Sequence, residues 1–226
     1  MINKIERWAW WGGALLAAIA GSVNAVGFLS YEHQAVTHLT GTTTLLSLAI
    51  GESQMQELMH LAGVIGAFVG GAAFSGFLIQ HSTLKLGRRY GAALLVESLL
   101  LACAAALMKS HGPVGSYFAS AACGLQNAMA STYSGALIRT THLSGMFTDL
   151  GAALGHWTRG IHVDWLRVRL CLTIIVSFIL GGVAGALLFT QFQYDTLYVP
   201  AAFTGVVGFC YIGYAHAKRG SGRVVT

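Results

Sequence analysis

The sequence contains little charge and very little proline. Only 9% of its 226 residues are Asp, Glu, Lys or Arg, whereas soluble domains carry about 25%. Hydrophobic residues make up 55% of the chain, and the apolar runs between its charged clusters have about the 20 residues that a membrane-spanning helix needs. The chain contains two prolines and 29 glycines, a composition that fits closely packed membrane helices. The composition therefore predicts an all-α polytopic membrane protein in contact with membrane lipid.

Several kinds of site lack their sequence signatures. The four cysteines are widely spaced inside apolar runs, so we expect neither a disulfide nor a metal site. The chain has no phosphate-binding glycine loop and no ATP-binding signature, so active transport would have to be secondary. We attribute the net charge of +5 to the cytoplasmic edge and its anionic lipid, not to a nucleic-acid partner. We expect no cofactor.

The apolar runs predict six membrane crossings. We expect the first run to remain as a membrane anchor instead of being cleaved as a signal, because Trp8, Trp10 and Trp11 resemble an interfacial belt. The six runs cover residues 8–30, 58–80, 91–108, 114–137, 170–189 and 196–214.

Positive charge predicts how these crossings are oriented. With six crossings and both termini in the cytoplasm, Lys109 alone among the 13 lysine and arginine residues lies outside, as the positive-inside rule favours. Residues 85–89 would then be cytoplasmic, and residues 31–34 and 109–112 external. An eight-crossing alternative would move four basic residues outside, namely Lys85, Arg88, Arg89 and Arg139.

Two short segments are near copies of each other. Residues 37–51 and 141–155 both begin with Thr-His-Leu, and composition alone does not account for so many matches. A helix over 39–51 would be about 20 Å long, too short for a ~30 Å hydrocarbon core. We interpret both as half-helices, either re-entrant or parts of broken crossings. The identical pairs are Thr37/Thr141, His38/His142, Leu39/Leu143, Gly41/Gly145, Thr44/Thr148, Leu46/Leu150, Ala49/Ala153 and Gly51/Gly155.

The duplication extends over both halves of the chain. Residues 21–25 resemble residues 124–128, and we match the Gly-Gly pair at 70–71 with the pair at 181–182. Each half would contain three crossings, so the second would be inverted relative to the first. We expect one membrane domain with a first repeat at 1–110, containing half-helix 38–51, and a second at 111–226, containing half-helix 142–155.

Polar residues of the repeat are candidates for a binding site. Hydroxyls, an imidazole and a glycine stand at each half-helix start, where free N–H groups favour an acceptor or an anion. An asparagine inside a crossing is costly unless it finds partners. The alternative is that these residues only cap, pack or bind the neighbouring half-helix. The predicted substrate-binding residues, expected to meet in one cavity between the repeats, are His38, Thr40, Gly41, His142, Ser144, Gly145, Asn24 and Asn127.

Two carboxylates break the symmetry of the repeat. Asp149 stands where the first repeat has Leu45, and Glu97 lies inside the third predicted crossing. An acid within the membrane is a functional-site candidate, so we predict that both take part in proton or ion coupling. For Glu97 the alternative is a structural ion pair, for instance with Arg139. Gln126 receives less weight, because the first repeat has Val23 in its place.

Two rows of small residues predict close helix packing. Gly66 and Gly70 are four residues apart in the second crossing, and Gly181 and Gly185 in the fifth. Such spacing lets helices approach closely, either within the chain or across a homodimer.

These features favour a transporter or channel for a small polar or anionic solute. A scaffold or interaction protein without transport is the main alternative. An intramembrane enzyme is less favoured, because Ser144, His142 and Asp149 lie on one helix too far apart to form a triad. We therefore expect no enzymatic activity.

Almost the whole chain resembles one known family. An Asn-Ala pair at Asn24, the Thr-Gly pair at Thr40, "GLQNA" at 124–128 and "RTTHLSGMFTDLG" at 139–151 resemble the YoaK-like family of uncharacterised bacterial transmembrane proteins. The resemblance implies a polytopic protein of the bacterial inner membrane and supplies neither a substrate nor a reaction. The family usually has an asparagine where this chain has Thr42, so any role of that asparagine does not transfer.

Overall fold

The computed structural model describes residues 7–30, 36–79, 88–110, 112–134 and 138–220. These residues form α-helices and one short 3-10 helix, and no strand occurs among them, which confirms the all-α prediction. The elements are α1 (Arg7–Leu29), α2 (Leu39–Gly51), α3 (Met55–Leu78), α4 (Arg88–Met108), α5 (Val114–Ser134), α6 (Leu143–Thr158), α7 (Trp165–Phe192), η1 (Gln193–Leu197) and α8 (Tyr198–Gly220).

Long apolar helices with apolar outer surfaces identify a multi-pass membrane protein. Four described segments are long and apolar enough to span a bilayer. Large apolar side chains lie on their outer surfaces, including Phe77 at 76% exposure and Phe209 at 69%. Lipid is the solvent that such a surface requires. The four segments are Trp10–Leu29, Met55–Leu78, Arg89–Met108 and Trp165–Tyr214, the last of which contains α7, η1 and most of α8.

The helix α5 is less apolar because it lies inside the bundle. It packs against both α3 and α4. Its polar side chains Ser116, Ser120 and Gln126 are buried, and the Ser120 hydroxyl donates a hydrogen bond of 2.8 Å to the carbonyl of Val64 on α3. Protein thus satisfies the polar groups that lipid would leave without partners.

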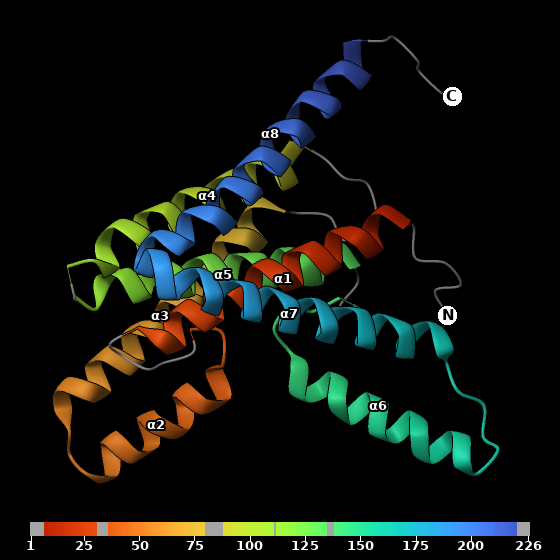
Figure 1. Ribbon diagram of the computed structural model, residues 1–226, viewed down its shortest axis with the longest axis horizontal. Helices are drawn as coiled ribbons and strands as arrows, with labels where there is room; N and C mark the ends of the chain where they lie inside the picture. The colour runs from red at the N-terminus through yellow and green to blue at the C-terminus, as the bar shows by residue number, and fades with distance from the viewer. Residues whose placement is uncertain (1–6, 31–35, 80–87, 111, 135–137, 221–226) are drawn as a thin grey trace.

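Helices from the two parts of the chain interleave (Figure 1). The main partner of α1 is α7, the main partner of α3 is α5, and α4 packs along both α8 and α5. Across the α4–α8 contact, the Ser98 hydroxyl donates to the carbonyl of Ala201 at 2.7 Å. The described residues of the two predicted repeats therefore share one packed body.

Glycines bring these helix pairs to backbone contact in two matching ways. On α1 and α7, Gly21 touches the carbonyl of Phe178, and Gly181 touches that of Ala18. On α5 and α3, an added Cβ would likewise collide with a carbonyl at each of two glycines. A Cβ on Gly124 would collide with the carbonyl of Phe68, and a Cβ on Gly71 with the carbonyl of Ala121.

These contacts correct the predicted match between the glycine pairs. Gly71 on α3 and Gly181 on α7 make equivalent contacts with a carbonyl of the partner helix, so the predicted match of Gly70 with Gly181 was wrong by one residue. Among the described residues of this chain the expectation for Gly66 and Gly70 also fails, since an added Cβ at either would meet none of their atoms within 4 Å. The prediction holds in the fifth crossing, where Gly185 closely approaches Ser22 on α1.

The two short helices occur where the repeat predicts them. They begin at Leu39 and Leu143, although α6 continues to Thr158, three residues beyond its predicted end. Among the described elements α2 packs against α3 alone, and α6 against α7 alone. In Figure 1 both start near the middle of the long axis and run toward opposite ends of the molecule.

The link between α7 and α8 is tied to the end of α4. The ammonium group of Lys109 lies 2.5 Å from the carboxylate of Asp195 in η1. This hydrogen bond raises the pKa of Lys109 above its ordinary value. The predicted external edge thus contains a contact between the two parts of the chain.

Candidate functional site

The two short helices begin with the same local arrangement. His38 (φ −95°, ψ 67°) and His142 (φ −92°, ψ 54°) precede α2 and α6 in nearly equal backbone conformations, and neither side chain caps its helix. Each ring lies over the glycine three residues later, Gly41 or Gly145, where an added Cβ would meet the ring at 2.5 Å. The glycines therefore make room for the histidine rings.

The hydroxyls near these starts bond the helices themselves. The Thr44 hydroxyl donates to the carbonyl of Thr40, and the Thr148 hydroxyl to that of Ser144, each at 3.0 Å. Such bonds to the carbonyl four residues earlier are a common use of threonine in helices. Thr40 and Ser144 themselves are exposed. The Thr44 and Thr148 hydroxyls thus have a structural role, and solute binding by Thr40 and Ser144 stays a prediction.

The start of α6 borders a pocket of about 380 Å³ between α6 and α7. Three predicted residues line it, namely His142, Gly145 and Asp149, together with Arg139 and Arg167. The remaining lining residues are Met146, Thr148, Leu170 and Cys171. The predicted residues of the first repeat, and Ser144, Asn127 and Glu97, do not line this pocket.

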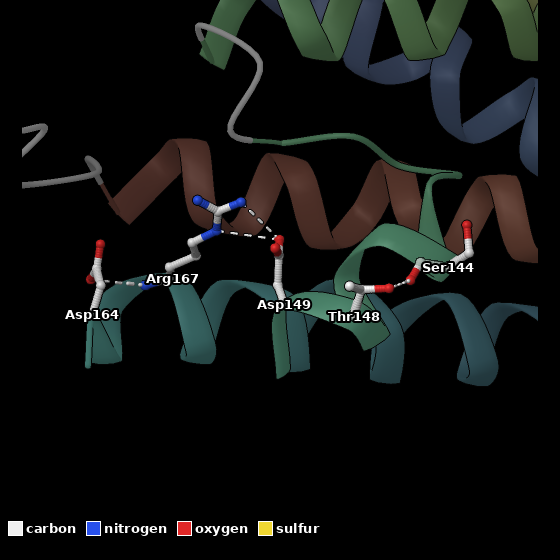
Figure 2. A network of polar contacts seen from close by, with 5 residues as sticks. All are labelled: Ser144, Thr148, Asp149, Asp164 and Arg167. Carbon is white, nitrogen blue, oxygen red and sulfur yellow. Dashed lines mark hydrogen bonds and ion pairs between the residues drawn. The ribbon is translucent and has the colours of Figure 1, made fainter. Parts of the chain in front are cut away.

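An ion pair joins the two helices at this pocket (Figure 2). The Arg167 guanidinium donates to Asp149 Oδ2 from Nη2 at 2.9 Å and from Nε at 3.3 Å. The start of α7 is fixed by Asp164, which accepts from the backbone N–H groups of Leu166 and Arg167. A second pocket of about 300 Å³ shares Asp149 and Arg167 and extends to His156 and His162.

The ion pair contributes little to stability. The side chains of Arg167 and Asp149 are 58% and 39% exposed, and exposed pairs are worth about 0–1 kcal/mol. Its larger effect is on the pocket, because Asp149 holds the Arg167 guanidinium at the wall. Sequence reasoning counted Arg167 only as a topology marker, because its contact with Asp149 depends on how α6 packs on α7.

In the first half, Asn24 binds the segment that leads into α2. The backbone N–H and the hydroxyl of Thr37 both donate to Asn24 Oδ1, at 3.2 and 2.7 Å. The repeat predicts the same role for Asn127, but its Oδ1 is buried without a hydrogen-bond partner among the described residues. The neighbouring Gln126 takes that role, because the Thr140 hydroxyl donates to its Oε1 at 3.1 Å.

Glu97 lies fully inside the bundle and binds the same glutamine. Gln126 Nε2 donates to Glu97 Oε1 at 2.8 Å. The alternative ion pair with Arg139 is not formed, since Arg139 is exposed and lines the pocket. Comparison with Val23 gave Gln126 too little weight; the cost of an amide in hydrocarbon was the signal that marked it.

The described contacts divide the predicted site residues among separate places. His142, Gly145 and Asp149 meet at the pocket, Asn24 binds Thr37, and Glu97 binds Gln126. They do not bring His38, Asn24 and Asn127 to the pocket. No group of three or more His, Cys, Asp or Glu side chains suited to a metal ion occurs in the part of the chain that the structure describes.

Comparisons with known proteins agree with this picture. Residues 12–210 match the family model described as "Protein of unknown function (DUF1275)". The chain is 30% identical over 194 residues to the UPF0700 transmembrane protein RA0705 of Rhizobium meliloti (strain 1021), covering 84% of this chain and 81% of that protein. No solved structure matches the chain. These findings confirm the expected uncharacterised transmembrane family, and the chain belongs to DUF1275.

Proposed function

We propose that the protein is a secondary transporter or channel for a small polar or anionic solute in the bacterial inner membrane. The observation that carries the proposal is the pocket beside α6, because two arginines and a histidine line it together with Asp149, which pairs with one of the arginines. Arg139, His142 and Arg167 suit an anion or a solute that presents hydrogen-bond acceptors. The proposal assigns no enzymatic activity.

The proposal includes six crossings in two inverted repeats. The matching glycine contacts of α1 with α7 and of α5 with α3 support a pseudo-twofold relation between the halves. The equal geometry at His38 and His142 supports it as well. Short helices that start inside an inverted-repeat bundle are a recurring way to direct helix N-termini at a solute. In this arrangement both termini are cytoplasmic.

Labelling from the two membrane sides tests the inverted arrangement. The turns after α2 and α6 contain the exposed residues Gln54 and Ile161. Single cysteines, Gln54→Cys and Ile161→Cys, in a folded background without native cysteines should react with a membrane-impermeant maleimide from outside and inside, respectively. Reaction of both from one side would reject the inverted repeats. The predicted external segment 31–34 lies outside the described residues.

Flux in proteoliposomes tests transport. A panel of small anions, cations and neutral polar solutes should reveal flux of at least one anion or polar solute through the wild-type protein. Arg167→Gln should reduce that flux at least about tenfold, equal to about 1.4 kcal/mol of lost binding. Glu52→Gln, a change at an exposed residue far along the chain from the pocket, should not reduce it. Absence of flux for every solute, from folded protein, would favour the scaffold.

Asp149 separates the two transport models. If the solute is an anion, Asp149→Asn should preserve solute binding, because Arg139, His142 and Arg167 remain. If a cation or proton is conducted and the carboxylates dominate, the same change should abolish conduction. Binding measured by calorimetry and conduction measured in proteoliposomes distinguish these results. A homodimer remains a prediction, tested by mass in detergent.

A further inference from the structure

Three fully buried polar side chains form a chain through the bundle. Glu97 on α4 and Gln126 on α5 are each 1% exposed, and Thr140, which precedes α6, is 0% exposed. Gln126 Nε2 donates to Glu97 Oε1, and Gln126 Oε1 accepts from the Thr140 hydroxyl. The carboxyl group is therefore linked to the segment that carries Arg139 and His142 into the pocket.

The Glu97 carboxyl is incompletely bonded. Its Oε2 is buried without a hydrogen-bond partner among the described residues, whereas an ionised carboxylate has about four acceptor positions. No basic side chain compensates for it in the described part of the chain, where the other titratable group that interacts with Glu97 is the Cys123 thiol on α5. Titratable groups on other elements packed against α4 interact elsewhere: Tyr211 on α8 with Tyr90 and Tyr214, Asp195 on η1 with Lys109, and His60 on α3 with Tyr117.

We propose that Glu97 is a proton-binding site and that Gln126 transmits its occupancy to Thr140. In the ionised state the amide N–H of Gln126 donates to the carboxylate. A proton delivered by hydronium, which leaves as water, forms the O–H bond of a neutral carboxyl group, which then donates to Gln126 Oε1 after the amide turns over. Gln126 Nε2 donates to the Thr140 oxygen, so that the Thr140 hydroxyl changes from donor to acceptor. Each state leaves the glutamine amide bonded on both sides.

This exchange reverses the hydrogen bond between Gln126 and Thr140, which lies beside the wall of the pocket. Thr140 lies between Arg139 and the pocket residue His142, so reversal of its hydrogen bond acts on the start of α6. A proton at Glu97 thereby becomes a coupling ion for the solute. This coupling rests on the proposed transport function, whereas proton binding does not.

Infrared difference spectroscopy tests the proton site on the full chain in detergent. Spectra between about pH 5 and about pH 9, the range in which buried carboxyl groups can titrate, should contain the C=O band of a protonated carboxyl. Glu97→Gln should remove this band, and Glu52→Gln, at an exposed carboxyl, should keep it. Thr140→Val, nearly equal in shape, should shift the band because in the protonated state Gln126 Nε2 loses the Thr140 oxygen that accepts its hydrogen bond. A band that survives Glu97→Gln, or no band in the wild type, would overturn the proposal.

Flux separates the failure of coupling from the failure of transport. Glu97→Gln should reduce the pH dependence of solute flux from about tenfold across the titration to less than about twofold. Unchanged pH dependence in this variant would overturn the coupling while transport stands. A normal infrared band without flux for any solute would overturn transport while the proton site stands. Size-exclusion profiles equal to wild type establish that each variant is folded.

Discussion

The two short helices share a backbone arrangement and differ in their chemistry. Both begin after a histidine whose ring lies over a glycine, and both have a threonine that bonds the preceding turn. The pocket and the ion pair described here belong to α6, whereas α2 has the exposed Leu45 where α6 has Asp149. The duplication thus reproduces geometry without reproducing charge. We therefore expect the second half to bind the solute and the first half to have a mainly structural role.

The largest predicted effect tests whether the helix contacts of the two halves are equivalent. Gly181→Leu and Gly71→Leu should each destabilise the protein by about 3 kcal/mol or more, because the side chain would collide with a backbone carbonyl. Gly66→Leu is the matched control, since no atom of the described residues lies within 4 Å of a Cβ added there. Thermal unfolding in detergent measures all three. A tolerated Gly71→Leu beside a disruptive Gly181→Leu would break the equivalence.

The next effect compares the buried amides. Gln126→Leu should cost about 3 kcal/mol, because Glu97 loses its donor and Thr140 its acceptor within a site closed to water. Asn24→Leu should cost about 1 kcal/mol, because only the groups of Thr37 lose their partner. Unfolding of both variants at neutral pH gives the difference. Equal losses of stability in the two variants would mean that the buried Glu97 carboxyl does not add to the cost of removing its partner Gln126.

A smaller effect distinguishes the turns that follow the short helices. Ser53 in the first turn and Gly160 in the second both have positive φ, 55° and 70°. Glycine adopts this region freely, whereas other residues pay about 1 kcal/mol. Ser53→Gly should therefore raise stability by about 1 kcal/mol, and Gly160→Ala should lower it by a similar amount. Changes of the same sign, measured by thermal unfolding, would contradict this account.

The smallest effect concerns the ion pair. Asp149→Asn should change the free energy of unfolding by less than about 1 kcal/mol, because both partners are partly exposed. Leu45→Asp, the matching change in α2, should create no bond to Arg167, which pairs with α6. Chemical denaturation of both variants tests this. A loss of several kcal/mol in Asp149→Asn would show that α6 depends on the pair for its position.

Sequence alone predicted the positions of the helices better than it predicted which helices pack together. The half-helix predicted from residue 142 on the basis of the repeat begins at Leu143. The partner of α1 could not be found this way, because lipid-facing and protein-facing sides are both apolar and only small residues distinguish them. That ambiguity also explains the error of one residue at Gly70 and Gly71.

Residues of the site could be predicted from the sequence, but which of them lie together could not. His142 was identified from the repeat and Asp149 as an acid that breaks its symmetry, but the comparison between repeats concealed Gln126, whose counterpart Val23 is apolar. Which side of a helix each polar residue occupies depends on rotations of a few tens of degrees, and those are set by packing. Asn127 illustrates the limit: one position from Gln126, it has a different environment.

The glycine contact of α1 with α7 has a consequence for how the chain is made. At synthesis rates of about 5–20 residues per second, α1 waits on the order of 10 s before its main partner emerges. During that time the narrow surface around Gly21, where no side chain of α7 yet lies, faces lipid or the insertion machinery. Early α-helices of this protein are therefore inserted well before they are packed, and assembly finishes only when the last third of the chain has been made.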